Sequence, residues 1–149
     1  MKVGDVAACL CKGLFAGVVG TAAMTVSSTA EMKIRDRQAS AAPANAAGKI
    51  LGVEPKDEAG EARFSNLVRW GYGTGWGAVR GLFGAAGLEG TTATVAHFGA
   101  VWGSEQVMLP ALGVAPPFWT WGAKEVGIDA FHHLVYAGAT GAAYALLDR

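Results

Sequence analysis

The residues best suited to chemistry stand at the start of the last apolar segment, where Asp129, His132 and His133 precede a long uncharged run. From Ala130 to Leu147 the sequence contains no Asp, Glu, Lys or Arg. Asp129 and His132 have the i, i+3 spacing of carboxylate and imidazole ligands in helical-bundle metal sites, with Glu105 as a candidate third ligand. This spacing occurs once, without a second His-containing copy. A metal or haem site at Glu105, Asp129 and His132 is therefore one hypothesis, and no cofactor is predicted.

Two other uses of the same residues compete with metal binding. His132 or His133 titrates near neutral pH, which would suit a proton or ion pathway in an oligomer. Alternatively, the cluster of Arg69, Glu105, Asp129, His132 and His133 is a structural lock between helices. In that hypothesis the charge of Arg69 balances those of Glu105 and Asp129. The lock is the favoured interpretation, because no convincing catalytic constellation accompanies these residues; the sequence therefore does not predict an enzyme.

The elements that must position these residues are four apolar segments, each about as long as a membrane-crossing helix. Between the first and second lies a charged connection, residues 31–63, in which Pro43 and Gly52 mark the start and stop of a short interfacial helix. The sequence predicts an all-α membrane protein, one domain over residues 1–149, with four transmembrane helices in two hairpins. The expected spans are approximately 13–30, 64–88, 92–109 and 126–147.

Antiparallel spans fix the depth of the polar residues. The first and third spans would end, and the second and fourth begin, at the face that bears the charged connection. The five clustered residues then lie in the half of the membrane nearest that face. Arg80 and His97 form a second polar pair in the other half. Ionisable residues inside a membrane are candidates for a functional site, because leaving them unpaired is costly.

Glycine indicates how closely the helices pack. The chain contains 22 glycines in 149 residues, most of them inside apolar stretches. Small residues at four-residue spacing allow membrane helices to approach closely. Five glycines are predicted to serve this packing: Gly13, Gly17, Gly73, Gly77 and Gly81.

Composition favours a membrane location over a soluble Gly/Ala-rich helical protein, which is the alternative. Hydrophobic residues make up 52% of the chain and charged residues 16%, against about 25% charged residues in soluble domains. The formal net charge is zero, so nucleic acid is not expected as a partner. The expected partners are the lipid bilayer and other membrane-protein chains or further copies of this chain. Lys and Arg are more frequent beside the 31–63 connection than at the opposite face, which places that connection in the cytoplasm.

Three Gly- and Ala-rich stretches stand out along the chain: GLFAGVVGTAAMT at residues 13–25, WGYGTGWGAVRGL at 70–82 and HHLVYAGATGAAY at 132–144. Together they resemble the YagU-like family of uncharacterised bacterial inner-membrane proteins. The resemblance implies a polytopic helical protein of the bacterial inner membrane and supplies no catalytic residues. With the composition and the glycine pattern, it predicts a structural, accessory or self-associating role.

Overall fold

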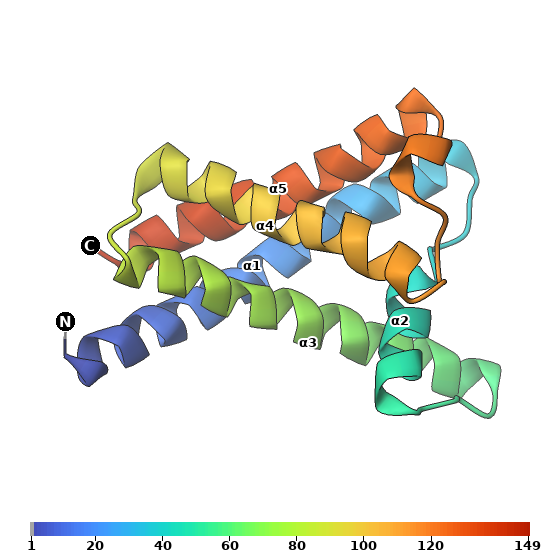
Figure 1. Cartoon of the computed structure of the whole chain (residues 1–149), viewed down its shortest axis with the longest axis horizontal. Helices are drawn as coiled ribbons and strands as arrows, with labels where there is room; N and C mark the ends of the chain where they lie inside the picture. Colours follow the sequence, from blue (N-terminus) through green and yellow to red (C-terminus); the bar gives the residue numbers. More distant parts are fainter. Residues whose placement is uncertain (1) are drawn as a thin grey trace.

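The computed structural model describes residues 2–149 and is helical throughout its regular elements (Figure 1). No strand is present in this range. The elements are α1 (Val3–Arg35), α2 (Ala42–Leu51), α3 (Glu58–Ala85), α4 (Gly90–Ala111), the short 3₁₀ turn η1 (Phe118–Thr120) and α5 (Ala123–Leu147). The all-α prediction is confirmed. Each predicted span lies largely within one long helix, and the predicted short helix in the first connection is α2.

Local chemistry explains where these helices begin and end. Helix α2 has Pro43 in its first turn and stops at Gly52, which adopts φ 65°, a left-handed conformation that glycine accepts without strain. Asp57 caps α3, because its carboxylate accepts a 2.6 Å hydrogen bond from the Gly60 amide. Helix α4 continues to Ala111, beyond the expected span 92–109, and includes Pro110. Proline here removes one amide donor in the last turn only, and Leu112 N–H still bonds to the Met108 carbonyl.

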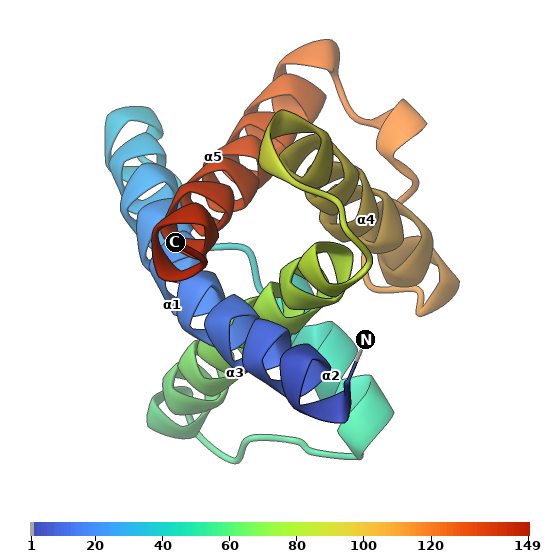
Figure 2. The same ribbon diagram turned by 90° about the vertical axis from the view of Figure 1, so that its left-hand side faces the viewer.

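The four long helices surround a common centre in the order α1, α3, α4, α5, as Figure 2 shows along the bundle. Helix α1 runs antiparallel to α5 between Lys12 and Arg35. At one end Lys12 pairs with Asp148 at 2.8 Å, and at the other Arg35 pairs with Glu125. Helices α4 and α5 form a second antiparallel pair. We call the end of the bundle where α1 finishes and α3 and α5 begin the loop end.

Glycines form the contact between α1 and α3. A Cβ atom added to Gly77 would lie 2.6 Å from the Gly17 Cα and 2.8 Å from the Gly17 amide nitrogen. Gly13, Gly73 and Gly81 are equally confined by the facing helix. The structure thus places all five predicted packing glycines on this one seam, where the two backbones touch.

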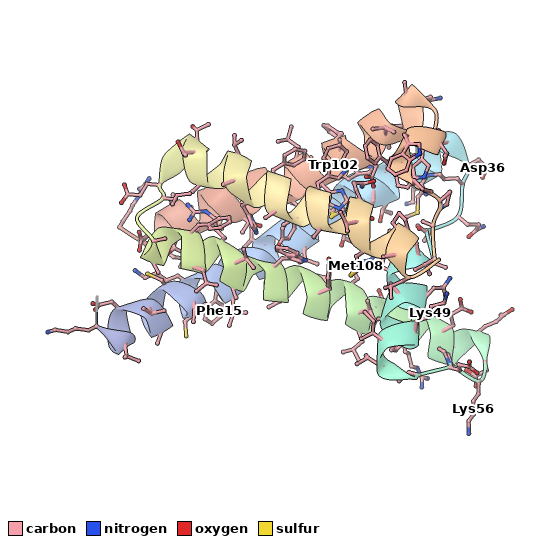
Figure 3. The ribbon with its side chains drawn as sticks, viewed as in Figure 1. Phe15, Asp36, Lys49, Lys56, Trp102 and Met108 are labelled. Atoms are coloured by element: carbon pink, nitrogen blue, oxygen red, sulfur yellow. The ribbon has the colours of Figure 1, made fainter. Side chains whose placement is uncertain are left out.

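Small and polar residues fill the interior, and large apolar side chains cover the exterior. The largest fully buried side chains are those of Tyr144, His97 and Thr140. Phe15, by contrast, is 70% exposed on the outer surface of α1 (Figure 3). Leu67 on α3 and Val107 on α4 are each 71% exposed. A water-soluble protein buries most of its large apolar residues, so this distribution is inverted.

Among the described helices, α1 alone is both long enough and apolar enough to cross a bilayer. Only 28% of its most apolar window is buried, whereas the core helix of a soluble protein would be mostly buried. Helix α3 contains seven glycines, against four in α1, and its charged residues include Arg69 and Arg80. The four predicted long helices are therefore present. Of these, only α1 has the length and mean hydropathy of a membrane-spanning helix.

Candidate functional site

A cavity of about 300 Å³ lies at the loop end, with walls from α1, α2, α3, α4 and α5. We call it the polar cavity. All five residues of the sequence-predicted cluster line it: Arg69, Glu105, Asp129, His132 and His133. Much of the remaining wall is apolar and includes Met24, Met32 and Met108; Figure 3 marks Met108 on α4. An apolar pocket with a few convergent polar groups is the usual form of a ligand site.

His133 joins α5 to α4 through its two ring nitrogens. Its Nδ1 lies 2.9 Å from the carbonyl oxygen of Asp129, one turn earlier in α5. A carbonyl can only accept a hydrogen bond, so Nδ1 carries the hydrogen. The other nitrogen, Nε2, lies 2.5 Å from Glu105 Oε2 on α4. Because both of these atoms are acceptors in their ordinary states, a proton must be shared between them at this distance.

Asp129 is held by two side chains that the sequence analysis did not select. Its Oδ2 accepts hydrogen bonds from the Trp102 indole nitrogen at 2.8 Å and from the Gln106 amide at 3.3 Å. The other oxygen, Oδ1, lies 3.7 Å from His133 Nδ1. Trp102 precedes Glu105 by three residues and Gln106 by four, so it lies one turn before both on α4. The i, i+3 spacing to Glu105 is the signal that could have identified Trp102, and the i, i+4 spacing to Trp102 could then have identified Gln106.

His132 faces α1 instead of α4. Its Nδ1 lies 2.7 Å from Ser27 Oγ, and its Nε2 lies 3.9 Å from Glu31 Oε2. The predicted metal set of Glu105, Asp129 and His132 is therefore wrong in one member. One candidate ligand atom from each of Glu105, Asp129 and His133 lies within 4.8 Å of the others. The reason is helical geometry, because residues i and i+4 are offset by roughly 40° and residues i and i+3 by roughly 60° the other way.

Arg69 lines the polar cavity but forms no ion pair with any residue of the described chain. The predicted charge balance between Arg69 and the acids Glu105 and Asp129 is thus not formed. Helix α2 contacts both α3 and α4 at the loop end, where those two helices diverge (Figure 1). His133 and the donors of α4 satisfy the acids in place of Arg69.

The second polar pair lies toward the other end of the bundle, and its members have separate partners. Arg80 is 2% exposed, and its guanidinium carbon lies 4.3 Å from the centre of the Tyr144 ring. Such a cation–π contact compensates part of the cost of burying the charge. His97 is fully buried, and its Nε2 lies 2.9 Å from the carbonyl oxygen of Trp76. Arg80 and His97 therefore bind α5 and α3, respectively, and not each other.

An ion network at the loop end closes the site on the α1 side. Arg35 bonds to both Glu31 and Glu125, and Arg37 Nη2 lies 2.5 Å from Glu31 Oε2. The hydrogen bonds from Arg37 and Arg35 lower the pKa of Glu31 to about 2. The hydrogen bond to Glu31 in turn raises the pKa of Arg37. The network fixes the ends of α1 and α5 relative to each other beside His132.

None of the protein-family models, curated proteins or solved structures compared with the chain matches it. Function must therefore be argued from the site itself. The hydroxyl of Ser27 lies 2.7 Å from His132 Nδ1, but Ser27 is not among the residues that line the polar cavity. The polar side of this cavity offers carboxylate oxygens and imidazole nitrogens, which are groups that hold a proton or a cation.

Proposed function

We propose that this chain is a multi-pass protein of the bacterial inner membrane with a structural or accessory role and no catalytic activity of its own. Its four spans are residues 13–30, 64–88, 92–109 and 126–147, with residues 31–63 in the cytoplasm. The single observation that carries the proposal is the inverted distribution of side chains. Large apolar residues face outward on every long helix, and polar residues lie inside.

The exposed apolar residues are spread around the bundle and not gathered in one patch. Val26 on α1 is 70% exposed, Leu67 on α3 71%, Val107 on α4 71% and Phe131 on α5 57%. One protein-binding patch would account for one face only. A surrounding lipid phase accounts for all of them. The resemblance to YagU-like inner-membrane proteins agrees with this proposal.

Charged residues of the first connection support the orientation of the loop end. Asp36, Lys49 and Lys56 all stand at that end of the bundle (Figure 3), whereas Phe15 lies on its body. Lys49 reaches across to the carbonyl of Leu112 at 2.7 Å, after the end of α4. These groups would meet water and lipid headgroups while the helices cross the apolar layer. The excess of Lys and Arg at the loop end supports a cytoplasmic location for that end.

Helix α4 offers a face suited to association with another membrane helix. Val95, Gly99, Gly103 and Val107 follow one another at four-residue spacing along α4. Both glycines have open space where a side chain would stand, and Val95 and Val107 are 62% and 71% exposed. Two glycines four residues apart, flanked by β-branched residues, let a second helix approach closely in lipid. We assign self-association, or association with another membrane protein, to this face.

Cysteine labelling tests the number of spans. In a background with Cys9 and Cys11 replaced by serine, Ser40→Cys marks the first connection and Glu89→Cys marks the turn between α3 and α4. With four spans, a membrane-impermeant maleimide added to intact cells labels Glu89→Cys and leaves Ser40→Cys unlabelled until the cells are opened. If α1 alone crosses the membrane, both positions lie on the same side and react alike. Release of the protein from membranes by alkaline carbonate would refute membrane insertion altogether.

Association is tested separately, by placing a larger side chain on the outer face of α4. Gly103→Leu fills the groove on the outer face of α4 without touching the inside of the bundle. We expect it to reduce the oligomer population measured by cross-linking in native membranes. Gly138→Leu is the matched control, since Gly138 on α5 also has open space around it. Equal cross-linking of both variants would show that the α4 face is not the contact.

A further inference from the structure

We propose that Glu105, Asp129 and His133 form a binding site for a divalent transition-metal ion, with its open positions facing the polar cavity. This goes beyond an accessory role in the membrane and does not depend on the number of spans. Three donors from two helices converge, with one candidate ligand atom from each within 4.8 Å of the others. The orientation of these side chains, their hydrogen-bond partners and the space beside them support a preorganised metal site.

The imidazole of His133 has the orientation of a metal ligand. Histidine ligands commonly donate the hydrogen of their other ring nitrogen to a backbone carbonyl or a carboxylate, which fixes the tautomer and the ring plane. His133 does this through Nδ1 and the Asp129 carbonyl, at 2.9 Å. The lone pair of Nε2 is thereby directed at Glu105. A cation between Nε2 and the Glu105 carboxylate satisfies both acceptors, which otherwise need a shared proton.

The Asp129 carboxylate is oriented in the same way. Trp102 and Gln106 both bond to Oδ2, and no hydrogen bond within the described chain engages Oδ1. Carboxylate ligands of metals are themselves typically hydrogen-bonded through one oxygen. The two donors therefore hold the group so that Oδ1 is left for coordination. Packing alone does not explain why the Trp102 indole donates a hydrogen bond to a carboxylate in an otherwise apolar wall.

A second, independent feature of the cavity is the unpartnered nitrogen of His132. This residue is 6% exposed and lines the polar cavity, and its Nε2 has no hydrogen-bond partner within the described chain. A buried polar atom without a partner is costly, and a bound water, ion or small ligand is one way to satisfy it. His132 supplies a further imidazole to the wall of the same cavity, on its α1 side.

The donor set favours particular metals. Two carboxylates and one imidazole suit Zn²⁺, Fe²⁺ or Mn²⁺, whereas the thiolate and thioether sulfurs preferred by Cu⁺ are absent from the three ligands. With three protein ligands, coordination positions are left open, as in metal sites that also bind a small ligand. The polar cavity of about 300 Å³ provides room for that ligand.

The test compares two isosteric variants of the detergent-solubilised full-length protein. Glu105→Gln keeps the contact with His133, because an amide N–H can donate to Nε2, but removes the anionic ligand. Glu31→Gln is the matched control, since Glu31 is also a largely buried carboxylate near a histidine of the cavity and belongs to the ion network instead. Each protein is stripped with a chelator and titrated with Zn²⁺, and with Co²⁺ as a spectroscopic probe.

We expect the wild-type chain and Glu31→Gln to bind one ion per chain, with visible Co²⁺ absorption bands typical of nitrogen and oxygen ligands. Glu105→Gln should lower the affinity by at least 10–100-fold, the loss usual even for an outer-shell partner. His133→Gln should lower it similarly. A wild-type protein that binds neither metal after chelation, or a Glu105→Gln variant that binds as tightly as wild type, would overturn the assignment.

Discussion

Gly77 offers the sharpest test of how the bundle is held together. It lies in the middle of the seam between α1 and α3, where any side chain would meet backbone instead of a movable side chain. The added Cβ of Gly77→Ala would lie 2.6 Å from the Gly17 Cα and would also press on the Gly13 carbonyl oxygen. Neither helix can relieve this contact by a rotamer change. The two helices must move apart along the seam.

The magnitude follows from two opposing effects. Overpacking of a close-packed contact costs about 1–3 kcal/mol. Replacing glycine by alanine inside a helix gains up to ~1 kcal/mol from the loss of backbone freedom in the unfolded chain. For Gly77→Ala we therefore expect a net destabilisation of about 1–2 kcal/mol. For Gly75→Ala, two residues away on the same helix with open space around it, only the gain applies, and the variant should be neutral or more stable.

The assay is equilibrium unfolding of the two purified variants in the same detergent, followed by helical circular dichroism. The pair shares a helix, a residue type and a substitution, so differences in detergent binding largely cancel. The predicted result is an opposite sign for the two changes in the free energy of unfolding. If both variants are stabilised, or if both are destabilised equally, the close approach of α1 and α3 is wrong.

Two further predictions concern polar contacts. The pKa of Glu31, which lies beyond the uncharged stretch 13–30, is held at about 2 by Arg37 and Arg35, against an ordinary 4.5. The contribution of Glu31 to the free energy of unfolding is therefore complete above pH 4.5 and is lost as the pH falls toward 2. The thermal midpoint in detergent should drop between these pH values, and Glu31→Gln should make that drop smaller. Separately, Tyr136→Phe removes a 2.6 Å hydrogen bond to the Gly73 carbonyl, and unfolding should show a loss of about 0.5–1.5 kcal/mol. Tyr72→Phe, at an exposed ring, should show almost none.

Helix positions and the packing glycines could be predicted from the sequence, because they depend on local patterns. A run of apolar residues between Pro, Gly and charged residues predicts a helix whatever surrounds it. The four-residue spacing of Gly73, Gly77 and Gly81 likewise predicts a close contact along one face. These patterns do not say which helix packs against the glycine face of α3. The structure shows that this helix is α1.

The composition of the site could be predicted, but its pairings could not. Depth along antiparallel helices brought five polar residues to one end of the bundle. Which of them touch depends on the neighbours of each helix face. One position separates His132, beside Glu31 on α1, from His133, beside Glu105 on α4. No helical wheel distinguishes these faces without knowing where α1 and α4 lie. The failure of Arg69 to reach an acid has the same origin, since α2 contacts both α3 and α4 at that end.

A structural lock and a metal site make different demands on the same contacts. A lock between α4 and α5 requires that each polar group be satisfied, and the bonds of Trp102 and Gln106 to Asp129, with that of Glu105 to His133, already provide it. It requires neither a cavity of about 300 Å³ beside these groups nor an unpartnered nitrogen on His132. Glu105→Gln separates the two uses, since it keeps the link between α4 and α5 and removes the anionic ligand. A lock alone predicts unfolding close to that of wild type and no metal bound by either protein, whereas the site predicts that metal stabilises the wild-type chain and not the variant.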